Sequence, residues 1–197
     1  MISGILLAAG NSTRMGKDNK LLLPYKGRPL FMRSLNAMLD SNLDEIIVVL
    51  GHDFKNMMPF LNNSCIKVGI NGNYLQGQTT SIQAGLNLIN PTSKAYLICL
   101  ADMPLINSLH INTLLDIYED SNDKELILRP GHNGLPGNPC LFSKCYYEEL
   151  LNCESNNGCR TVIKKNVKNL RIFETSDNAY FTDVDTPSEY LQFNSKV

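Results

Sequence analysis

Residues 4–24, GILLAAGNSTRMGKDNKLLLP, determine the fold that we expect for this chain. The apolar run at residues 5–7, followed by Ala8 and Ala9, is typical of a strand buried on both faces of a parallel sheet. A polar loop follows directly, and its small residues allow a tight turn that points amide N–H groups inward. These small residues are Gly10, Asn11, Ser12, Thr13 and Gly16.

Positive charge gathers in the same loop, at Arg14, Lys17 and Lys20. A planar guanidinium grips phosphate oxygens bidentately, and a lysine ammonium acts as a point charge. We therefore interpret the loop as a polyphosphate cradle rather than as a solvated basic turn. The spacing of Gly10 and Gly16 does not match a P-loop, and the stretch has no Gly-x-Gly-x-x-Gly fingerprint of a dinucleotide site.

Length and charge limit the remaining classes. The chain has 197 residues and a formal net charge of −1 at pH 7. This length predicts one domain, residues 1–197, around one sizeable core. The near-neutral charge argues against nucleic acid or an anionic membrane surface as the main partner. No apolar stretch reaches the ~20 residues that span a bilayer, and no basic leader precedes the first strand, so we expect a cytoplasmic protein.

Six cysteines and three histidines are scattered along the chain without the spacing of a zinc site. No Cys-x-x-Cys pair occurs, so we expect reduced thiols rather than a disulfide framework. Each histidine stands alone in the sequence, which favours a surface or packing role over metal ligation.

Apolar runs and helical periodicity alternate through roughly the first 120 residues. Strands are expected at residues 46–50, 66–70 and 95–101, and helices at residues 28–41, 54–61, 81–89 and 108–118. Met57, Met58, Phe60 and Leu61 of the short helix are expected in the core. The alternation predicts a doubly wound, mainly parallel sheet with helices on both faces. Closely spaced later strands, at residues 125–128, 140–142, 170–173 and 179–182, indicate that an antiparallel strand joins the sheet.

Acidic residues follow at points where ligands commonly bind. Asp102 stands at the carboxyl end of the strand expected at residues 95–101, which is the ligand-binding edge of an open α/β sheet. Asp183 and Asp185 flank one residue, so they point to the same face if the segment is extended. Mg²⁺ is often held by one or two carboxylates plus substrate phosphates. We favour this role over a simple helix cap for Asp102 because a phosphate loop ends a neighbouring strand.

Two further loops are candidate binding segments. Residues 71–81, NGNYLQGQTTS, deliver the chain to a helix that Thr79, Thr80 or Ser81 can cap; the same hydroxyls also suit an anion or a base edge. Residues 129–139, RPGHNGLPGNP, contain too many glycines and prolines for regular structure. A loop of this length is often a lid or a binding loop, with disorder as the alternative.

Taken together, these motifs resemble the nucleotidyltransferases that mature the molybdenum cofactor, most closely the cytidylyltransferase branch. The resemblance rests on Leu7-Ala8-Ala9-Gly10-x-Ser12-x-Arg14-Met15-Gly16, Lys20-Leu21-Leu22-Leu23-Pro24 and Gly27-x-Pro29-Leu30. Guanylyl-transferring relatives usually carry Leu-Ala-Gly-Gly at the first motif. The resemblance covers nearly the whole chain and implies a three-layer, Rossmann-like fold of the nucleotide-diphospho-sugar transferase type.

The resemblance also implies roles for individual residues. The nucleotide-binding set comprises Leu7, Ala8, Ala9, Gly10, Ser12, Arg14, Gly16, Lys20, Gly77, Thr79, Thr80, Ser81 and Asp102. Asp102 is expected as the first metal ligand and Asp183 as the second, with Asp185 close behind. Gly137, Asn138 and Pro139 are expected to line the acceptor pocket, and Arg160 faces phosphate there or is solvated at a helix start. Asn138 replaces the histidine of the family, which leaves the acceptor open.

These expectations define a hypothesis of function. Arg14, Lys20 and Asp102, together with Mg²⁺, would catalyse transfer of CMP from CTP to molybdenum-loaded molybdopterin, whose ionised phosphate needs no general base. A molybdoenzyme client is a possible further partner. The alternatives are another phosphorylated acceptor, such as a sugar or polyol phosphate, or the use of GTP. An alternative of another class is a non-catalytic accessory protein that binds a nucleotide or cofactor.

Overall fold

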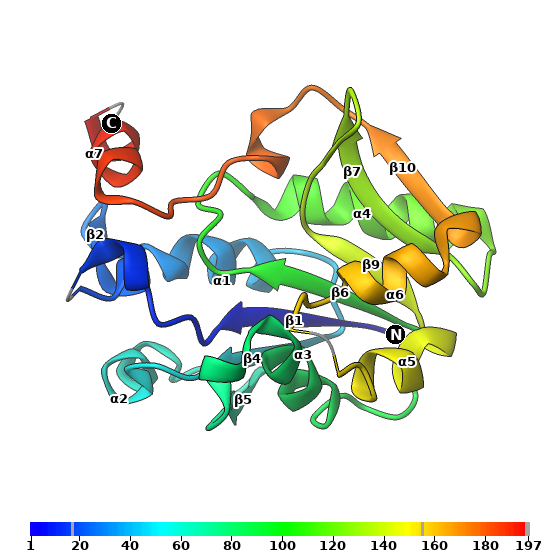
Figure 1. Cartoon of the computed structure of the whole chain (residues 1–197), viewed down its shortest axis with the longest axis horizontal. Coiled ribbons are helices and arrows are strands. Elements are labelled where there is room, and N and C mark those ends of the chain that lie inside the picture. Colours follow the sequence, from blue (N-terminus) through cyan, green and yellow to red (C-terminus); the bar gives the residue numbers. More distant parts are fainter. Residues whose placement is uncertain (17, 155, 196–197) are drawn as a thin grey trace.

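The computed structural model describes residues 1–16, 18–154 and 156–195. Its centre is an eight-stranded sheet with the order β10-β7-β9-β6-β1-β4-β5, in which β8 pairs with β7 (Figure 1). The strands are β1 (Ile2–Ala8), β4 (Glu45–Leu50), β5 (Ile66–Ile70), β6 (Ala95–Leu100), β7 (Ile127–His132), β8 (Leu135–Pro136), β9 (Cys140–Ser143) and β10 (Leu170–Glu174).

Most strand pairs in this sheet are parallel. β1 runs parallel to β4 and β6, β4 to β5, and β10 to β7, whereas β9 lies antiparallel between β6 and β7. Every residue of β1 is buried, as expected for a central strand covered on both faces. The predicted doubly wound sheet with an antiparallel strand is therefore confirmed.

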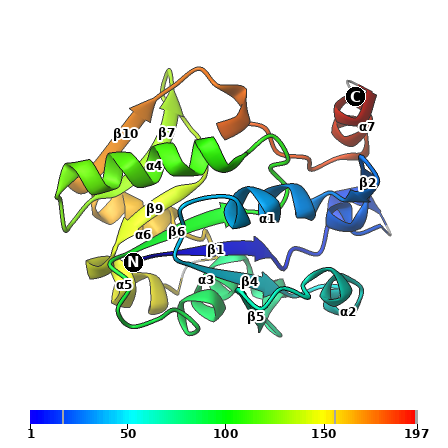
Figure 2. The same cartoon turned by 180° about the vertical axis from the view of Figure 1, so that it is seen from behind.

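Helices cover both faces of the sheet (Figures 1 and 2). α1 (Phe31–Leu39) and α4 (Ser108–Ser121) pack on one face. α3 (Gln78–Leu86), α5 (Tyr147–Leu151) and α6 (Arg160–Lys165) pack on the other. α2 (Phe54–Met57) follows β4. α7 (Pro187–Ser195) packs beside the small hairpin of β2 (Pro24–Tyr25) and β3 (Arg28–Pro29) through the rings of Tyr25 and Phe193, whose centroids are 4.6 Å apart.

The path of the chain places a switch in strand order beside β1. From β1 the chain builds β4 and β5 on one side, and then returns to form β6 on the other side of β1. Ligands bind at such switch points, outside the carboxyl ends of the strands. The carboxyl ends of β1 and β6 are therefore the first place to look for a site.

α3 approaches β1 very closely at Gly85, and this contact yields a prediction. A Cβ at this position would lie 2.5 Å from Ile5 Cγ2. We expect Gly85→Ala to lower the free energy of unfolding by about 1–3 kcal/mol through overpacking, measured by urea denaturation. Gly72→Ala is the matched control, because nothing lies within 4 Å of a Cβ there. Coincident unfolding curves for the Gly85 variant and the parent would contradict the packing argument.

Several predicted boundaries were wrong near the surface. The helix expected from residue 28 begins at Phe31, because Arg28 and Pro29 pair with the β2 strand instead. Met58 and Phe60 were expected in the core but are 39% and 43% exposed. The strand expected at residues 179–182 is a 3₁₀ turn, Asn178–Tyr180, in which the Asp177 carboxylate accepts the Ala179 N–H at 2.9 Å.

Residues 129–139 are more regular than expected. β7 continues through Pro130 to His132, and β8 returns antiparallel to it. The turn between them places Asn133 and Gly134 at positive φ, 50° and 80°. Asn-Gly at a tight hairpin turn is a strong hairpin signal, and it outweighs the high proline and glycine content.

The cysteines and the start of α7 add two local features. All six cysteines are free, the arrangement expected for reduced thiols. Thr186 and Glu189 form a capping box at the start of α7, since each side chain accepts a backbone N–H of the other residue. Within the described ranges, no helix has the length and apolar character needed to cross a membrane.

Candidate active site

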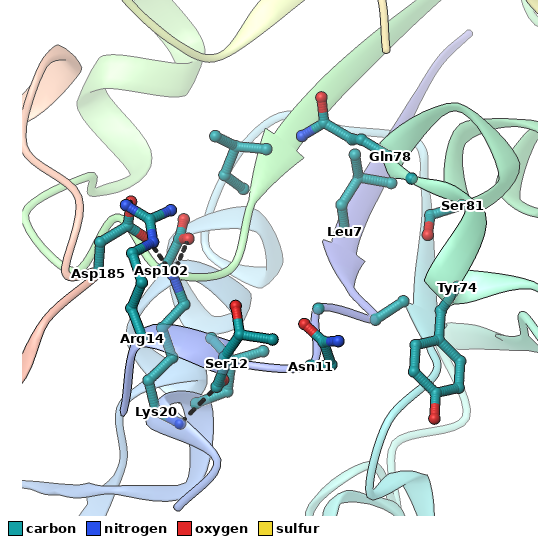
Figure 3. Close-up of a pocket in the computed structure, with 16 residues that line it drawn as sticks. Leu7, Asn11, Ser12, Arg14, Lys20, Tyr74, Gln78, Ser81, Asp102 and Asp185 are labelled. Carbon is teal, nitrogen blue, oxygen red and sulfur yellow. Dashed lines mark hydrogen bonds and ion pairs between the residues drawn. The ribbon is translucent and has the colours of Figure 1, made fainter. Parts of the chain in front are cut away.

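A cleft of about 320 Å³ opens at the switch point (Figure 3). Leu7 at the end of β1 and Leu100 at the end of β6 contribute apolar walls. One side is formed by the loop after β1, and the opposite side by Tyr74 and the start of α3. The cleft thus combines an apolar region with a polar, charged end.

Local hydrogen bonds shape the loop after β1. Ser12 adopts a left-handed conformation with φ of 51°, and its Oγ accepts the backbone N–H of Lys20 at 3.1 Å. The Asn19 side chain accepts the Leu21 N–H at 3.0 Å and so caps a 3₁₀ turn, Lys20–Leu22. These contacts turn the chain back on itself and bring Lys20 into the cleft, where its side chain is only 11% exposed.

Lys20 joins two carboxylates from distant parts of the chain. Its Nζ lies 2.6 Å from Asp102 Oδ2 and 2.5 Å from Asp185 Oδ1 (Figure 3). Arg14 Nη1 lies 2.7 Å from the other oxygen of Asp185. The Val184 N–H donates to the carbonyl of Asp102 at 2.9 Å, and this bond holds the segment that carries Asp185 beside the end of β6.

The ion pairs determine the protonation of this cluster. Burial opposes the charged form of Lys20, but the charges and hydrogen bonds of Asp102 and Asp185 outweigh it and raise the Lys20 pKa. Burial likewise opposes ionisation of Asp185, but Lys20 and Arg14 outweigh it and lower the Asp185 pKa. Lys20 and Asp185 are therefore both charged near neutral pH.

Charge balance in the cleft indicates what it can bind. The cations of Arg14 and Lys20 are matched by the carboxylates of Asp102 and Asp185, so a polyphosphate gains little net attraction unless another cation accompanies it. Arg14 is 66% exposed. An exposed ion pair contributes little, so Arg14 is free to exchange Asp185 for a phosphate.

The acidic groups fit a divalent cation. Asp102 Oδ1 is buried without a hydrogen-bond partner, and such an orphaned oxygen suits a hard cation. Burial and the negative charges of Asp102 and Asp185 raise the pKa of Asp183, and a cation would relieve the repulsion among these carboxylates. Among the described residues, no group of three or more His, Cys, Asp or Glu forms a ready-made metal site, so substrate oxygens would complete the coordination.

Most residues predicted to bind the nucleotide gather in this cleft. Those that line it are Leu7, Ala9, Gly10, Ser12, Arg14, Lys20, Gly77, Ser81 and Asp102, and Asp185 joins them from the predicted metal ligands. Ala8 instead packs into the core on the opposite face of β1, because side chains alternate along a strand. Gly16 does not line the cleft, and Lys17 lies outside the described residues.

Thr79 and Thr80 lie beside the cleft rather than in its wall. The Thr79 hydroxyl accepts the Gly158 N–H at 3.0 Å, and the Thr80 hydroxyl donates to the Gly77 carbonyl at 3.0 Å. Gly77 occupies the N-cap position of α3. None of the three hydroxyl residues that were expected to cap the helix does so. The helix begins three residues earlier than expected, at Gln78, so the hydroxyls fall inside its first turn.

The remaining predicted residues occupy neighbouring positions. Asp183 lines a second cavity, together with Tyr25 and Phe193. The Gly137 carbonyl accepts two N–H groups of Arg129, at 2.6 and 3.2 Å. Gly137, Asn138 and Pro139 follow β8, and exposed Arg160 begins α6; none of these four lines the cleft.

Several lining residues lie outside the nucleotide-binding and metal-ligand sets predicted from the sequence. These are Asn11, Thr13, Leu21, Tyr74, Gln78 and Leu100. Leu100 was detectable, since strand alternation puts it on the same side as Leu7 at the ends of paired strands. Tyr74 carried no such signal, because a short 3₁₀ turn, Tyr74–Gln76, sets its direction.

Fold and site together define an α/β protein with a cationic loop and paired carboxylates at a switch point, where such folds commonly bind nucleotides. Comparison with known proteins gives the family. The model of the MobA-like NTP transferase domain matches residues 4–170. The chain therefore belongs to the MobA-like NTP transferase family, and it is a nucleotidyltransferase in class.

Curated relatives cover nearly the full chain. Molybdenum cofactor cytidylyltransferase of Escherichia coli is 30% identical, with 96% of this chain and 94% of the relative covered. Purine catabolism protein PucB of Bacillus subtilis is 28% identical, with coverages of 95% and 93%. Nicotine blue oxidoreductase of Paenarthrobacter nicotinovorans is 26% identical, with coverages of 94% and 92%.

A solved structure supports the same fold. Rv0371c of Mycobacterium tuberculosis in complex with manganese superposes with a TM-score of 0.82, at 21% identity and coverages of 100% and 99%. A nucleotidyl transferase of Methanothermobacter superposes with a TM-score of 0.85, at 20% identity and coverages of 100% and 97%. The nucleotide-diphospho-sugar transferase type of fold expected from the sequence is confirmed by such structural neighbours.

Proposed function

We propose that this protein transfers CMP from CTP to the terminal phosphate of molybdenum-loaded molybdopterin and releases pyrophosphate. The observation that carries the proposal is the cluster of Lys20, Asp102 and Asp185 beneath the loop after β1. That cluster offers a buried cation and metal-binding carboxylates at one end of a cleft large enough for a nucleotide.

The choice of CTP and of a pterin acceptor has two supports. A cytidylyltransferase acting in molybdenum cofactor synthesis is 30% identical over nearly the whole chain. Ala9, which stands where guanylyl-transferring relatives usually have glycine, lines the cleft. The extra methyl group of alanine at this position is proposed to favour a pyrimidine over the larger guanine.

The proposed chemistry is a displacement at phosphorus. An oxygen of the acceptor phosphate attacks the α-phosphorus of CTP, a new P–O–P linkage forms, and the bond to the β-phosphate breaks as pyrophosphate leaves. An ionised phosphate is already a nucleophile, so no general base is required. The main barrier is repulsion between anions and the charge that builds on the leaving group.

Several residues of this chain stabilise that negative charge. Lys20 remains fixed by two carboxylates and presents its ammonium to the triphosphate, while Arg14 moves from Asp185 to a phosphate oxygen. Backbone N–H groups of the loop supply further donors. Asp102 and Asp185 would hold a divalent cation such as Mg²⁺, which when bound neutralises part of the charge of the triphosphate and of pyrophosphate. A manganese complex of a similar fold supports divalent metal use.

The acceptor is proposed to enter from the side of β7. Gly137, Asn138, Pro139 and Arg160 belong to segments on that side of the sheet. The backbone of Asn138 is fixed by a bond from its N–H to the Tyr180 carbonyl at 2.9 Å, and the side chain is half-buried. Its amide would offer hydrogen bonds to the pterin. A molybdoenzyme that receives the product is the proposed client.

The test is pyrophosphate release by the purified protein with Mg²⁺ and each nucleoside triphosphate in turn. Each reaction is run with and without molybdenum-loaded molybdopterin. We expect release with CTP that requires the pterin, and little release with GTP, ATP or UTP.

Other outcomes of this assay separate the alternatives. Release with CTP and a sugar or polyol phosphate, but not with the pterin, would identify that phosphate as the acceptor in place of the pterin. A preference for GTP would contradict the role of Ala9. Nucleotide binding without release under any condition would indicate an accessory protein and overturn the proposal.

A further inference from the structure

Arg129, on β7, has an edge of its guanidinium that no hydrogen-bond acceptor among the described residues occupies. Nε and Nη2 both donate to the Gly137 carbonyl, at 3.2 and 2.6 Å. A guanidinium carries five N–H donors, so these contacts occupy one edge and leave the Nη1/Nη2 edge open. The side chain is half-buried, yet it forms no ion pair with an acidic side chain in the described part of the chain. Charges withdrawn from water are normally paired.

The position of Arg129 brings it to the functional edge of the sheet. β6 and β7 are both antiparallel to β9, so they run in the same direction and their carboxyl ends lie at one edge. Leu128 belongs to the core beneath α1 and α4, whereas Ile127 belongs to the core beneath α3 and α6. Alternation therefore places Arg129 on the α3 and α6 face, which is also the face of Leu7 and Leu100.

Arg129 lies within electrostatic range of the segment that packs against the wall of the nucleotide cleft. Burial and the Cys140 thiol raise the pKa of Cys159, and the Arg129 guanidinium opposes this rise, which puts Arg129 near the start of α6. The preceding residue, Gly158, contacts the side chain of Gln78, and a Cβ at Gly158 would collide with Gln78 Oε1. Gln78 lines the cleft (Figure 3).

We propose that the open edge of Arg129 binds the phosphate group of the acceptor substrate. A phosphate monoester matches this edge because two parallel N–H donors bind two of its oxygens. The bond from Arg129 to the Gly137 carbonyl holds the guanidinium in place before the acceptor arrives, so little side-chain entropy is lost on binding. This inference rests on the proposed function for the identity of the acceptor.

Three variants test the assignment. Arg129→Gln removes the charge but keeps an N–H donor for Gly137, and Arg129→Lys keeps the charge but loses the paired donors. Arg171→Gln is the control, because it removes an equal charge from an exposed position on β10 whose register partner is Leu128. That partner belongs to the core on the other face of the sheet.

Binding of inorganic phosphate is the first readout. This binding is measured by ³¹P NMR, with the cleft filled by Mg²⁺ and a non-hydrolysable CTP analogue. We expect about a 10- to 100-fold weaker affinity in Arg129→Gln, an intermediate affinity in Arg129→Lys, and no change in Arg171→Gln. In turnover, the same order is expected for the KM of the acceptor, with the KM for CTP within about twofold of the parent.

The two proposals fail differently. Parent protein that releases no pyrophosphate contradicts the proposed function, while the phosphate titration still reports on Arg129. Equal phosphate affinity in the parent and Arg129→Gln, or none in the parent, overturns the assignment of Arg129. A variant that raises the KM for CTP but not that of the acceptor also overturns it, because Arg129 then acts through the nucleotide cleft.

Discussion

Lys20→Ala is expected to lower kcat/KM by about 10²- to 10³-fold, as the loss of one preorganised charge contact does in other active sites. The Lys20 side chain is 11% exposed and two carboxylates hold its ammonium at 2.5 and 2.6 Å, so the ammonium is fixed before the substrate binds. Its loss removes a cation from the triphosphate and leaves Asp102 and Asp185 facing each other. Steady-state pyrophosphate release measures the effect.

The same variant has a stability signature. Removing one partner of a buried ion pair destabilises a protein because the remaining charges are uncompensated. We expect a lower Tm for Lys20→Ala without divalent cations, and partial recovery in Mg²⁺ that exceeds any Mg²⁺ effect on the parent. Thermal unfolding with EDTA or MgCl₂ measures this difference.

Lys67→Ala provides a matched control for the loss of a lysine–carboxylate pair. Lys67 Nζ lies 2.5 Å from Glu45 Oε1, away from the cleft. Its replacement should leave turnover unchanged. Near-normal turnover by Lys20→Ala would show that Lys20 only neutralises the two carboxylates and takes no part in transfer.

The sheet was predictable because its signals are local. The apolar runs of β1, β4 and β6 are buried on both faces. A continuous apolar run of this kind predicts a buried strand from its own residues, whatever the rest of the chain packs against it. The boundaries that failed depend on tertiary contacts. Phe60 has the spacing of a core residue, yet its helix ends at the edge of the fold, where the ring contacts Phe31 from the surface. No local pattern distinguishes these two cases.

The site was predictable only as a set of residue types. A phosphate loop and an acid after β6 indicated a site for a nucleotide and a metal, and both the loop and the acid line the cleft. The pairing of Lys20 with Asp102 and Asp185 was not visible, because it depends on a hydrogen bond from Val184 to the carbonyl of Asp102. Arg129 was also missed. Its open edge exists only because Gly137 comes back beside β7.

Asp102→Asn is expected to lower turnover by about 10²- to 10³-fold and to weaken the dependence on Mg²⁺. The change preserves the shape of the side chain but removes its negative charge. Among the described residues, Asp102 is the only one with a buried carboxylate oxygen that lacks a hydrogen-bond partner. Lys20 keeps its contact with Asp185 in this variant, so folding should be maintained. Initial rates at increasing Mg²⁺ concentration give both quantities.

A comparison of Asp185→Asn with Asp183→Asn then assigns the second ligand. The sequence motif placed Asp183 first, but Asp185 shares Lys20 with Asp102 and lines the same cleft, whereas Asp183 faces the neighbouring cavity. Two carboxylates that converge on one ammonium are also close enough together to share a divalent cation beside it. We therefore expect Asp185→Asn to raise the Mg²⁺ concentration for half-maximal rate far more than Asp183→Asn. The reverse order would make Asp183 the ligand and leave Asp185 as the anchor of Lys20 and Arg14.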